Sequence, residues 1–185
     1  MMKTITEQLA NYKSVHLNRN NMITHFIGIP LIIFSIALVL STVTFEVSLD
    51  AASLPDFISG SYRFTLALAV AAAVMVYYFM LHIPLALMIL ACFFPVFYGA
   101  HLLAQGEGSY LLAGIIFFVG WVFQFIGHGF EKAKPAFIDD LNQLLIGPLF
   151  LIAEIYFALG LNKVMAKDIH DQAVEKRLLL EQAKA

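Results

Sequence analysis

Long apolar runs, separated by short polar stretches, dominate the chain between residues 26 and 160. A helix that crosses a bilayer needs about 20 mostly apolar residues, with 17 to 25 as the working range. The pattern therefore predicts an all-α fold, a polytopic transmembrane helix bundle with four to six membrane segments, in a single membrane domain (residues 1–185). The candidate spans are residues 26–44, 64–81, 83–103, 110–127 and 144–160.

Two segments interrupt or follow this apolar pattern. Residues 45–62 contain acidic residues, Pro55 and Gly60, which predicts a polar loop with turns, with or without one short interfacial helix. Residues 162–185 alternate Lys, Asp, Glu and Arg with Leu and Ala, which is typical of a solvated amphipathic helix. We expect this tail to lie along the membrane surface.

The basic residues favour one orientation in the membrane. Lys3, Lys13 and Arg19 precede the first span, so the positive-inside rule predicts a cytoplasmic N-terminus. Five crossings would then put the basic tail outside, against the same rule. Either the short last segment, which contains Gly147 and Pro148, enters and returns, or another segment does not cross. The membrane would be the inner membrane in a bacterium and the endoplasmic reticulum in a eukaryote, and the oligomeric state stays open.

The composition supports a membrane protein and excludes several functions. Hydrophobic residues make up 61% of the chain, against about 45 to 50% in soluble domains. No Lys/Arg cluster interleaved with aromatic residues suggests a nucleic-acid partner. The sequence also contains no glycine-rich phosphate loop, HExxH pair or GxSxG elbow, so nucleotide binding, zincin protease and serine hydrolase chemistry have no motif to support them.

The first group of candidate functional residues precedes and begins the first span: Tyr12, His16, Asn18, Asn21 and His25. On one straight helix His16 and His25 would point to opposite sides, so they converge only if the chain bends between them. The residues from Asn18 to Asn21 favour such a bend. The alternative is an interfacial segment whose polar side chains cap a helix and meet lipid head groups.

The second group is Trp121, Gln124, His128 and Glu131, whose spacing places them on one face of a helix. A purely structural alternative is a packing seam in which Gln124 and His128 hydrogen-bond to neighbouring helices. Ionisable groups at membrane depth are costly and usually functional. We therefore favour a functional site.

Topology connects the two groups. If the first four spans cross, then His16, His25, His82 and His128 lie at one membrane boundary and His101 at the opposite one. Neutral imidazoles that meet at one end of a bundle suit a divalent transition metal, iron or zinc in particular. His82 has the alternative of marking only a tight turn.

Two acidic residues could assist such a site. Glu131 could be a carboxylate ligand, or it could accept a hydrogen bond from an imidazole N–H. Glu154 lies about ten residues into the last span, where an ionised carboxylate needs a partner, and it must face the bundle interior. It either makes a structural hydrogen bond, through Asn142 or Gln143, or supports the metal or a proton path.

The same residues form a recognisable sequence pattern. It consists of YKSVHLN (12–18), HFIGIP (25–30), WVFQFIGH (121–128), Glu131, Pro135 and Ala136. This pattern resembles the 2-hydroxy fatty acid dioxygenase family, a membrane family whose fungal members act at the endoplasmic reticulum in phytosphingosine breakdown. The resemblance extends from residue 12 to about residue 160, and the WxxQFxGH block is its most specific part.

The resemblance implies an iron(II) enzyme that uses O2 to shorten a 2-hydroxy fatty acid by one carbon, a form of alpha-oxidation. It implies His16, His25 and His128 as metal ligands, with Glu131 as a catalytic residue beside them. The acyl chain would then lie between the spans. A metal-dependent hydroxylase or desaturase fits less well, because two irons need more histidines at close spacing. The remaining alternative is a small membrane transporter or assembly factor without metal chemistry.

Overall fold

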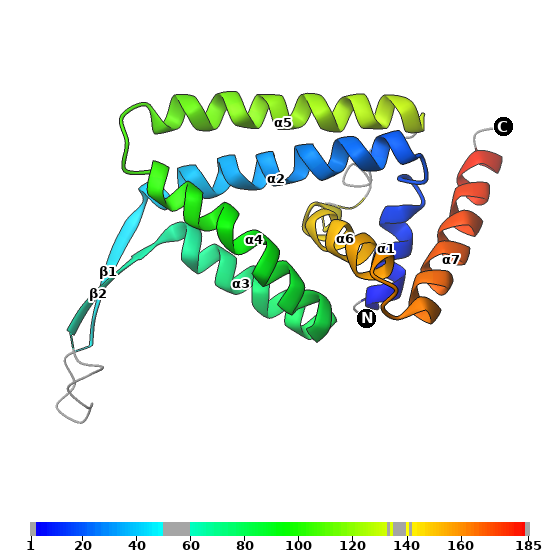
Figure 1. Cartoon of the computed structure of the whole chain (residues 1–185), viewed down its shortest axis with the longest axis horizontal. Helices are drawn as coiled ribbons and strands as arrows, with labels where there is room; N and C mark the ends of the chain where they lie inside the picture. The colour runs from blue at the N-terminus through cyan, green and yellow to red at the C-terminus, as the bar shows by residue number, and fades with distance from the viewer. Residues whose placement is uncertain (1–2, 50–59, 133, 135–139, 141, 184–185) are drawn as a thin grey trace.

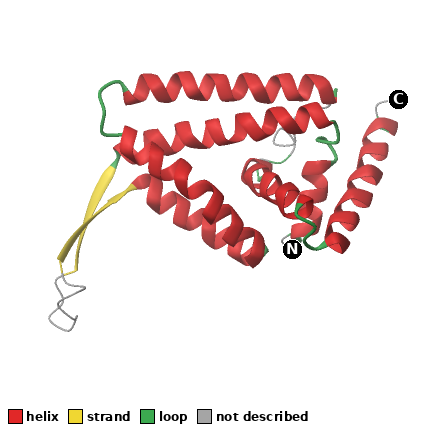
Figure 2. Cartoon of the chain, in the orientation of Figure 1, coloured by secondary structure: helices red, strands yellow, loops and turns green. Residues whose placement is uncertain are grey.

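The computed structural model describes residues 3–49, 60–132, 134, 140 and 142–183. Helices form nearly all of this part, and the strands form a single hairpin (Figure 2). The elements are α1 (Ile5–Lys13), α2 (Arg19–Thr42), β1 (Thr44–Leu49), β2 (Gly60–Thr65), α3 (Leu66–Leu81), α4 (Ile83–Leu103), α5 (Ser109–Glu131), α6 (Gln143–Ala158) and α7 (Lys163–Gln182).

The predicted helical fold class is confirmed, and each of the five apolar runs is a helix, α2 to α6. In the described part of the chain α2, α4 and α5 are long and apolar enough to cross a membrane. The other two have 16 residues each, or about 24 Å of helix, which is shorter than the roughly 30 Å hydrocarbon core. The predicted amphipathic tail is also helical, as α7.

The helices α2 and α5 lie antiparallel along most of their lengths (Figure 1). Glycines allow the close approach, since a Cβ added at Gly28 of α2 would lie 2.7 Å from the carbonyl oxygen of Gly120. A Cβ at Gly127 would lie 2.2 Å from the hydroxyl oxygen of Thr24. Small residues at such contacts are typical of helix pairs in membranes. The pairing sets the start of α2 against the end of α5.

The outward side of α5 is apolar. Leu111, Phe118 and Phe125 repeat at seven-residue spacing and are at least 60% exposed. The opposite side buries polar residues, including Gln124 and His128. An apolar face toward the surroundings and a polar face toward the bundle are what lipid contact favours.

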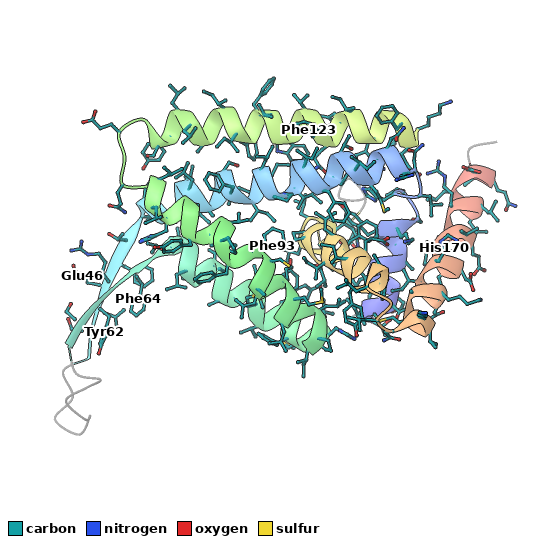
Figure 3. All side chains as sticks on the ribbon, viewed as in Figure 1. Glu46, Tyr62, Phe64, Phe93, Phe123 and His170 are labelled. Atoms are coloured by element: carbon teal, nitrogen blue, oxygen red, sulfur yellow. The ribbon has the colours of Figure 1, made fainter. Side chains whose placement is uncertain are left out.

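The segment after α2 corrects the sequence prediction. Residues 45–62 were expected to be a loop, but their ends form β1 and β2, which pair antiparallel from Thr44 with Thr65 to Leu49 with Gly60. Cross-strand pairs stabilise the hairpin, among them Glu46 with Arg63 at 2.8 Å. Glu46 projects from the hairpin in Figure 3. Residues 50–59 lie outside the described residues, so the interfacial helix stays a prediction.

The last two helices return to the end of the bundle where the chain begins. α7 packs against α1, and Figure 1 shows α1, α6 and α7 gathered at the end where α2 starts and α5 finishes. α6 buries most of its surface, including Ile146, Leu149 and Phe150. This arrangement places the N- and C-terminal helices at the same end of the bundle, whereas the number of crossings stays a prediction.

Candidate metal centre

The chain bends between α1 and α2, as predicted, but the bend lies at residues 14–18 rather than 18–21, because α2 already begins at Arg19. α1 ends at Lys13, and the side chain of Asn18 caps α2 by accepting a hydrogen bond from the Asn20 N–H at 2.8 Å. His16 lies in the bend, and His25 lies in the second turn of α2. Because the chain changes direction between them, the two rings lie close together and their Nε2 atoms are neighbours. On a straight helix the two side chains would point to opposite sides.

His16, His25 and His128 form one buried cluster, with a ring nitrogen from each lying within 4.8 Å of the others. The Nε2 atoms of His16 and His25 are 3.0 Å apart. The ring centroid of His128 lies 5.0 Å from the centroids of both. The pairing of α2 with α5 therefore brings together the three histidines that the resemblance implies.

Backbone carbonyls orient two of the three rings. The Nδ1–H of His16 donates to the Tyr12 carbonyl oxygen at 2.6 Å, and the Nδ1–H of His25 donates to the Asn21 carbonyl oxygen at 2.9 Å. Because a carbonyl can only accept, each Nδ1 carries the proton, and a neutral ring then leaves Nε2 with a bare lone pair. Metal-binding histidines almost always have such an outer partner.

The positions of the Nε2 lone pairs of His16 and His25 indicate whether a metal could bind here. Two bare Nε2 atoms at 3.0 Å repel each other unless a proton or a cation lies between them. A shared proton is disfavoured, since burial and the nearby His25 hold the pKa of His16 well below its usual value. A divalent cation could accept both lone pairs and one from His128. The donor set thus fits a transition metal with three imidazole ligands and open positions.

An aromatic wall supports the cluster from α1 and α6. The Tyr12 ring stacks on His16 with centroids 4.1 Å apart and planes 1° from parallel, and Phe150 lies against both rings. Burial raises the pKa of the Tyr12 hydroxyl, so it stays protonated. Gly147 provides the space, because a Cβ there would lie 3.1 Å from that hydroxyl oxygen. α6 therefore fixes the position of His16 through Tyr12.

Glu131 lies beside the cluster and outside the group of ligand atoms. One of its carboxylate oxygens accepts from the Asn18 backbone N–H at 2.8 Å and from the Asn21 side-chain amide at 3.1 Å. The other lies 3.3 Å from the Arg177 guanidinium. Glu131 is therefore linked to His25 through Asn21. The side-chain amide of Asn21 donates to Glu131, and its backbone carbonyl accepts from the His25 ring. The catalytic role implied by the resemblance stays a prediction.

The two remaining predicted histidines lie elsewhere. His82 caps α4, with its side chain accepting from the Leu85 N–H at 3.3 Å, so the tight-turn alternative describes its position. His101 lies in the last turn of α4, toward the hairpin end. Of the four histidines that topology assigned to one boundary, three meet in the described structure.

Glu154 has a partner, but not one of those expected. It forms a partly buried ion pair with Lys13 of α1, whereas Asn142 and Gln143 bond to other groups. This ion pair between helices fits the structural alternative for Glu154, but the expected partners Asn142 and Gln143 were wrong. The bend before α2 places Lys13 beside α6, which the spacing within each helix could not indicate.

The histidine cluster opens into an elongated apolar cavity of about 860 Å³. Tyr12, Gln124 and the three histidines line one end, and Thr65 and His101 line the other. Between them the walls come from α2, α3 and α4, including Ile33, Ala71 and Phe93; Figure 3 shows Phe93 on α4, on the side toward α2. Such a cavity suits a long, mostly apolar ligand with a polar group at the histidine cluster.

Comparison with known proteins identifies the family of this chain. The model of a family described as "2-hydroxy-palmitic acid dioxygenase Mpo1-like" matches residues 2–159. The chain belongs to this family. It is also 31% identical, over 183 residues, to the 2-hydroxy-palmitic acid dioxygenase MPO1 of Saccharomyces cerevisiae, with 95% of this chain and 93% of the yeast protein covered. No solved structure matches the chain.

The resemblance seen in the sequence is therefore confirmed, and the region that matches the Mpo1-like family includes all three clustered histidines. One residue beside the site was missed. Arg177 contacts Glu131 from α7, but in the sequence it is one of several charged residues of the tail. The available signal was its four-residue spacing from Ala173 and Ile169, which are buried on the same face of α7.

Proposed function

We propose that this chain is an iron(II)-dependent dioxygenase that shortens 2-hydroxy fatty acids by one carbon at a membrane. One observation carries the proposal: three buried imidazoles converge at the polar end of a long apolar cavity. The yeast relative is named for 2-hydroxy-palmitic acid, and family membership supports extending that activity to this chain.

His16, His25 and His128 are the proposed ligands. Iron(II) held by these residues would supply activation of O2. The chain's own contribution includes holding the His16 and His25 rings in place through the carbonyls of Tyr12 and Asn21. Burial of the three rings keeps bulk water from the site.

The polar end of the cavity offers a partner for the substrate head group. Gln124 lines it, and within the described residues the buried Nε2 of Gln124 has no hydrogen-bond partner. A buried unpaired amide costs about 1 to 3 kcal/mol. A carboxylate or hydroxyl bound beside the histidines could remove that cost. The unpaired side-chain amide of Gln124 thus favours binding of a fatty acid over binding of a hydrocarbon without a polar group.

The length of the cavity suits a long acyl chain. Between His25 and Ser41, which both line it, α2 rises about 24 Å at 1.5 Å per residue. One leaflet of acyl chains occupies about 15 Å, half of the roughly 30 Å hydrocarbon core. The cavity could therefore hold the whole chain of a long fatty acid while its head group stays at the histidines.

The overall reaction balances without another reductant. R–CH(OH)–COOH and O2 give R–COOH, CO2 and H2O, so the substrate loses four electrons and O2 accepts four. The bond between the carboxyl carbon and the hydroxyl-bearing carbon breaks. A site for a nicotinamide or flavin is not needed, which agrees with the absence of nucleotide-binding motifs from the sequence.

The same proposal includes a membrane location. The three long apolar helices and the exposed apolar face of α5 support it, and a cavity between such helices would receive its substrate from lipid. The membrane would be the inner membrane in a bacterium and the endoplasmic reticulum in a eukaryote.

The test uses protein purified in detergent. It is loaded anaerobically with iron(II), given 2-hydroxypalmitic acid and O2, and assayed for pentadecanoic acid and for iron content. Product should form with 2-hydroxypalmitic acid, not with palmitic acid, and should disappear after chelation and return with iron(II). Protein that holds no iron and forms no product would contradict the proposal and leave a transporter or assembly factor as the better account.

A further inference from the structure

The C-terminal helix reaches the candidate metal centre through one side chain. Arg177 of α7 lies 3.3 Å from a carboxylate oxygen of Glu131 and donates to the Glu131 carbonyl oxygen at 3.0 Å. Both contacts are at the last residue of α5, where a cation is favoured by the free carbonyls of the helix end. The family match ends at residue 159, before α7 begins.

Packing of α7 against α1 places Arg177 at this position. Ile169 and Ala173 are 1% and 0% exposed, and with Arg177 they form one face of α7 at four-residue spacing. The side chain of Arg177 is only 17% exposed. In contrast, Lys167 on the same helix pairs with Asp171 at the surface, where its side chain is 79% exposed.

Glu131 needs this cation. Its side chain is 3% exposed, and a buried carboxylate without a charged partner is strongly destabilised. Without Arg177, its remaining donors among the described residues would be the Asn18 N–H and the Asn21 amide. The buried carboxylate would then lack a charged partner, and any movement of it toward water would weaken its bonds to Asn18 and Asn21.

Those two asparagines hold the start of α2. Asn18 is the N-cap of the helix, and the Asn21 carbonyl accepts the Nδ1–H of His25 at 2.9 Å. The contacts therefore form one chain, from Arg177 through Glu131 and Asn21 to His25. Outer partners of metal-binding histidines typically change metal affinity by about 10- to 100-fold.

We propose that Arg177 is a positioning residue, which orients His25 for metal binding through Glu131 and Asn21, so that α7 is part of the metal site. This inference rests on the proposed metal site. It predicts that metal affinity and geometry depend on a residue beyond the region matched by the family.

The experiment titrates the detergent-purified full chain with cobalt(II) alone and records affinity, the visible d–d absorption spectrum and the thermal midpoint without metal. Arg177→Ala should bind cobalt(II) about 10-fold more weakly, with an altered spectrum. Arg177→Lys should recover part of the affinity, because it keeps the charge but loses the two-pronged contact. Glu131→Gln, which keeps the side-chain size but replaces the charge and one acceptor oxygen with an NH2 donor, should alter the spectrum in the same direction.

Two controls separate positioning from general stability. Lys167→Ala removes an exposed ion pair of α7, and Glu181→Ala removes the other acidic partner of Arg177, at 2.7 Å. Both should keep the wild-type spectrum and affinity. The inference is overturned if Arg177→Ala has the wild-type affinity and spectrum, or if Lys167→Ala changes the affinity and the spectrum as much as Arg177→Ala does. In either case, product formation by the wild type would still support the proposed function. Wild type that binds no cobalt(II) would overturn the inference through the metal site itself.

Discussion

An ion pair lies near each end of the helix pair formed by α2 and α5, and the two ion pairs differ in their surroundings. At the histidine end, Glu131 and Arg177 have side chains 3% and 17% exposed, within a network that reaches His25. At the hairpin end, Glu46 and Arg63 are 58% and 71% exposed. The first pair fixes the geometry of a site, whereas the second is screened by solvent. Burial and connection to other groups therefore decide which polar residues matter here.

The largest effect is expected from His25. His25→Ala removes one of three proposed ligands, so iron binding should fall by more than the 10- to 100-fold typical of losing an outer partner, and product formation should be abolished. His170→Ala is the matched control, because that histidine is exposed on α7 (Figure 3). Iron content and product would be measured together. Equal iron content in the two variants would remove His25 from the site.

The close helix contact at the histidine end gives the next effect. Gly127→Ala forces a Cβ to within 2.5 Å of the Asn21 side-chain oxygen. Overpacking of this kind costs about 1 to 3 kcal/mol, so the thermal midpoint and the iron content should both decrease. Gly114→Ala on the same helix has nothing within 4 Å of the added Cβ and should keep both. Similar melting curves for the two variants would mean that α2 and α5 are not in close contact there.

A substitution in the wall of the cavity should change the selectivity for acyl-chain length more than it changes total activity. Ala71 lines it from α3, and Ala72 is exposed beside it. Ala71→Phe should narrow the cavity and reduce kcat/KM for long 2-hydroxy acids more than for short ones, while Ala72→Phe should leave the ratio unchanged. Activity on a series of chain lengths measures this. An unchanged ratio for Ala71→Phe would indicate that the acyl chain lies elsewhere.

The smallest effect is expected at the hairpin. Glu46→Gln removes an exposed ion pair, which is typically worth about 0 to 1 kcal/mol. Iron content, activity and the thermal midpoint should all stay close to wild type. A loss of iron as large as that of Arg177→Ala would contradict the contrast between the two ends.

Much of the helical structure could be predicted from local patterns. The apolar runs indicated α2 to α6, and the spacing of Gln124, His128 and Glu131 indicated a shared face of α5, because the helical repeat alone determines which residues share a face. The bend between His16 and His25 was also predictable. The hairpin was missed because Glu, Arg and Ser on β1 and β2 resemble a polar loop until their strands pair.

The sequence by itself determined the apolar helices, the family and the three histidines that the resemblance implied. Only the tertiary structure decided that these histidines converge, that Glu154 pairs with Lys13, and that Arg177 meets Glu131. The physical reason is the distance along the sequence between the residues that are in contact. A helical face follows from neighbours three or four residues apart, whereas the last two contacts join residues 141 and 46 positions apart, and only the packing of whole helices brings such residues together.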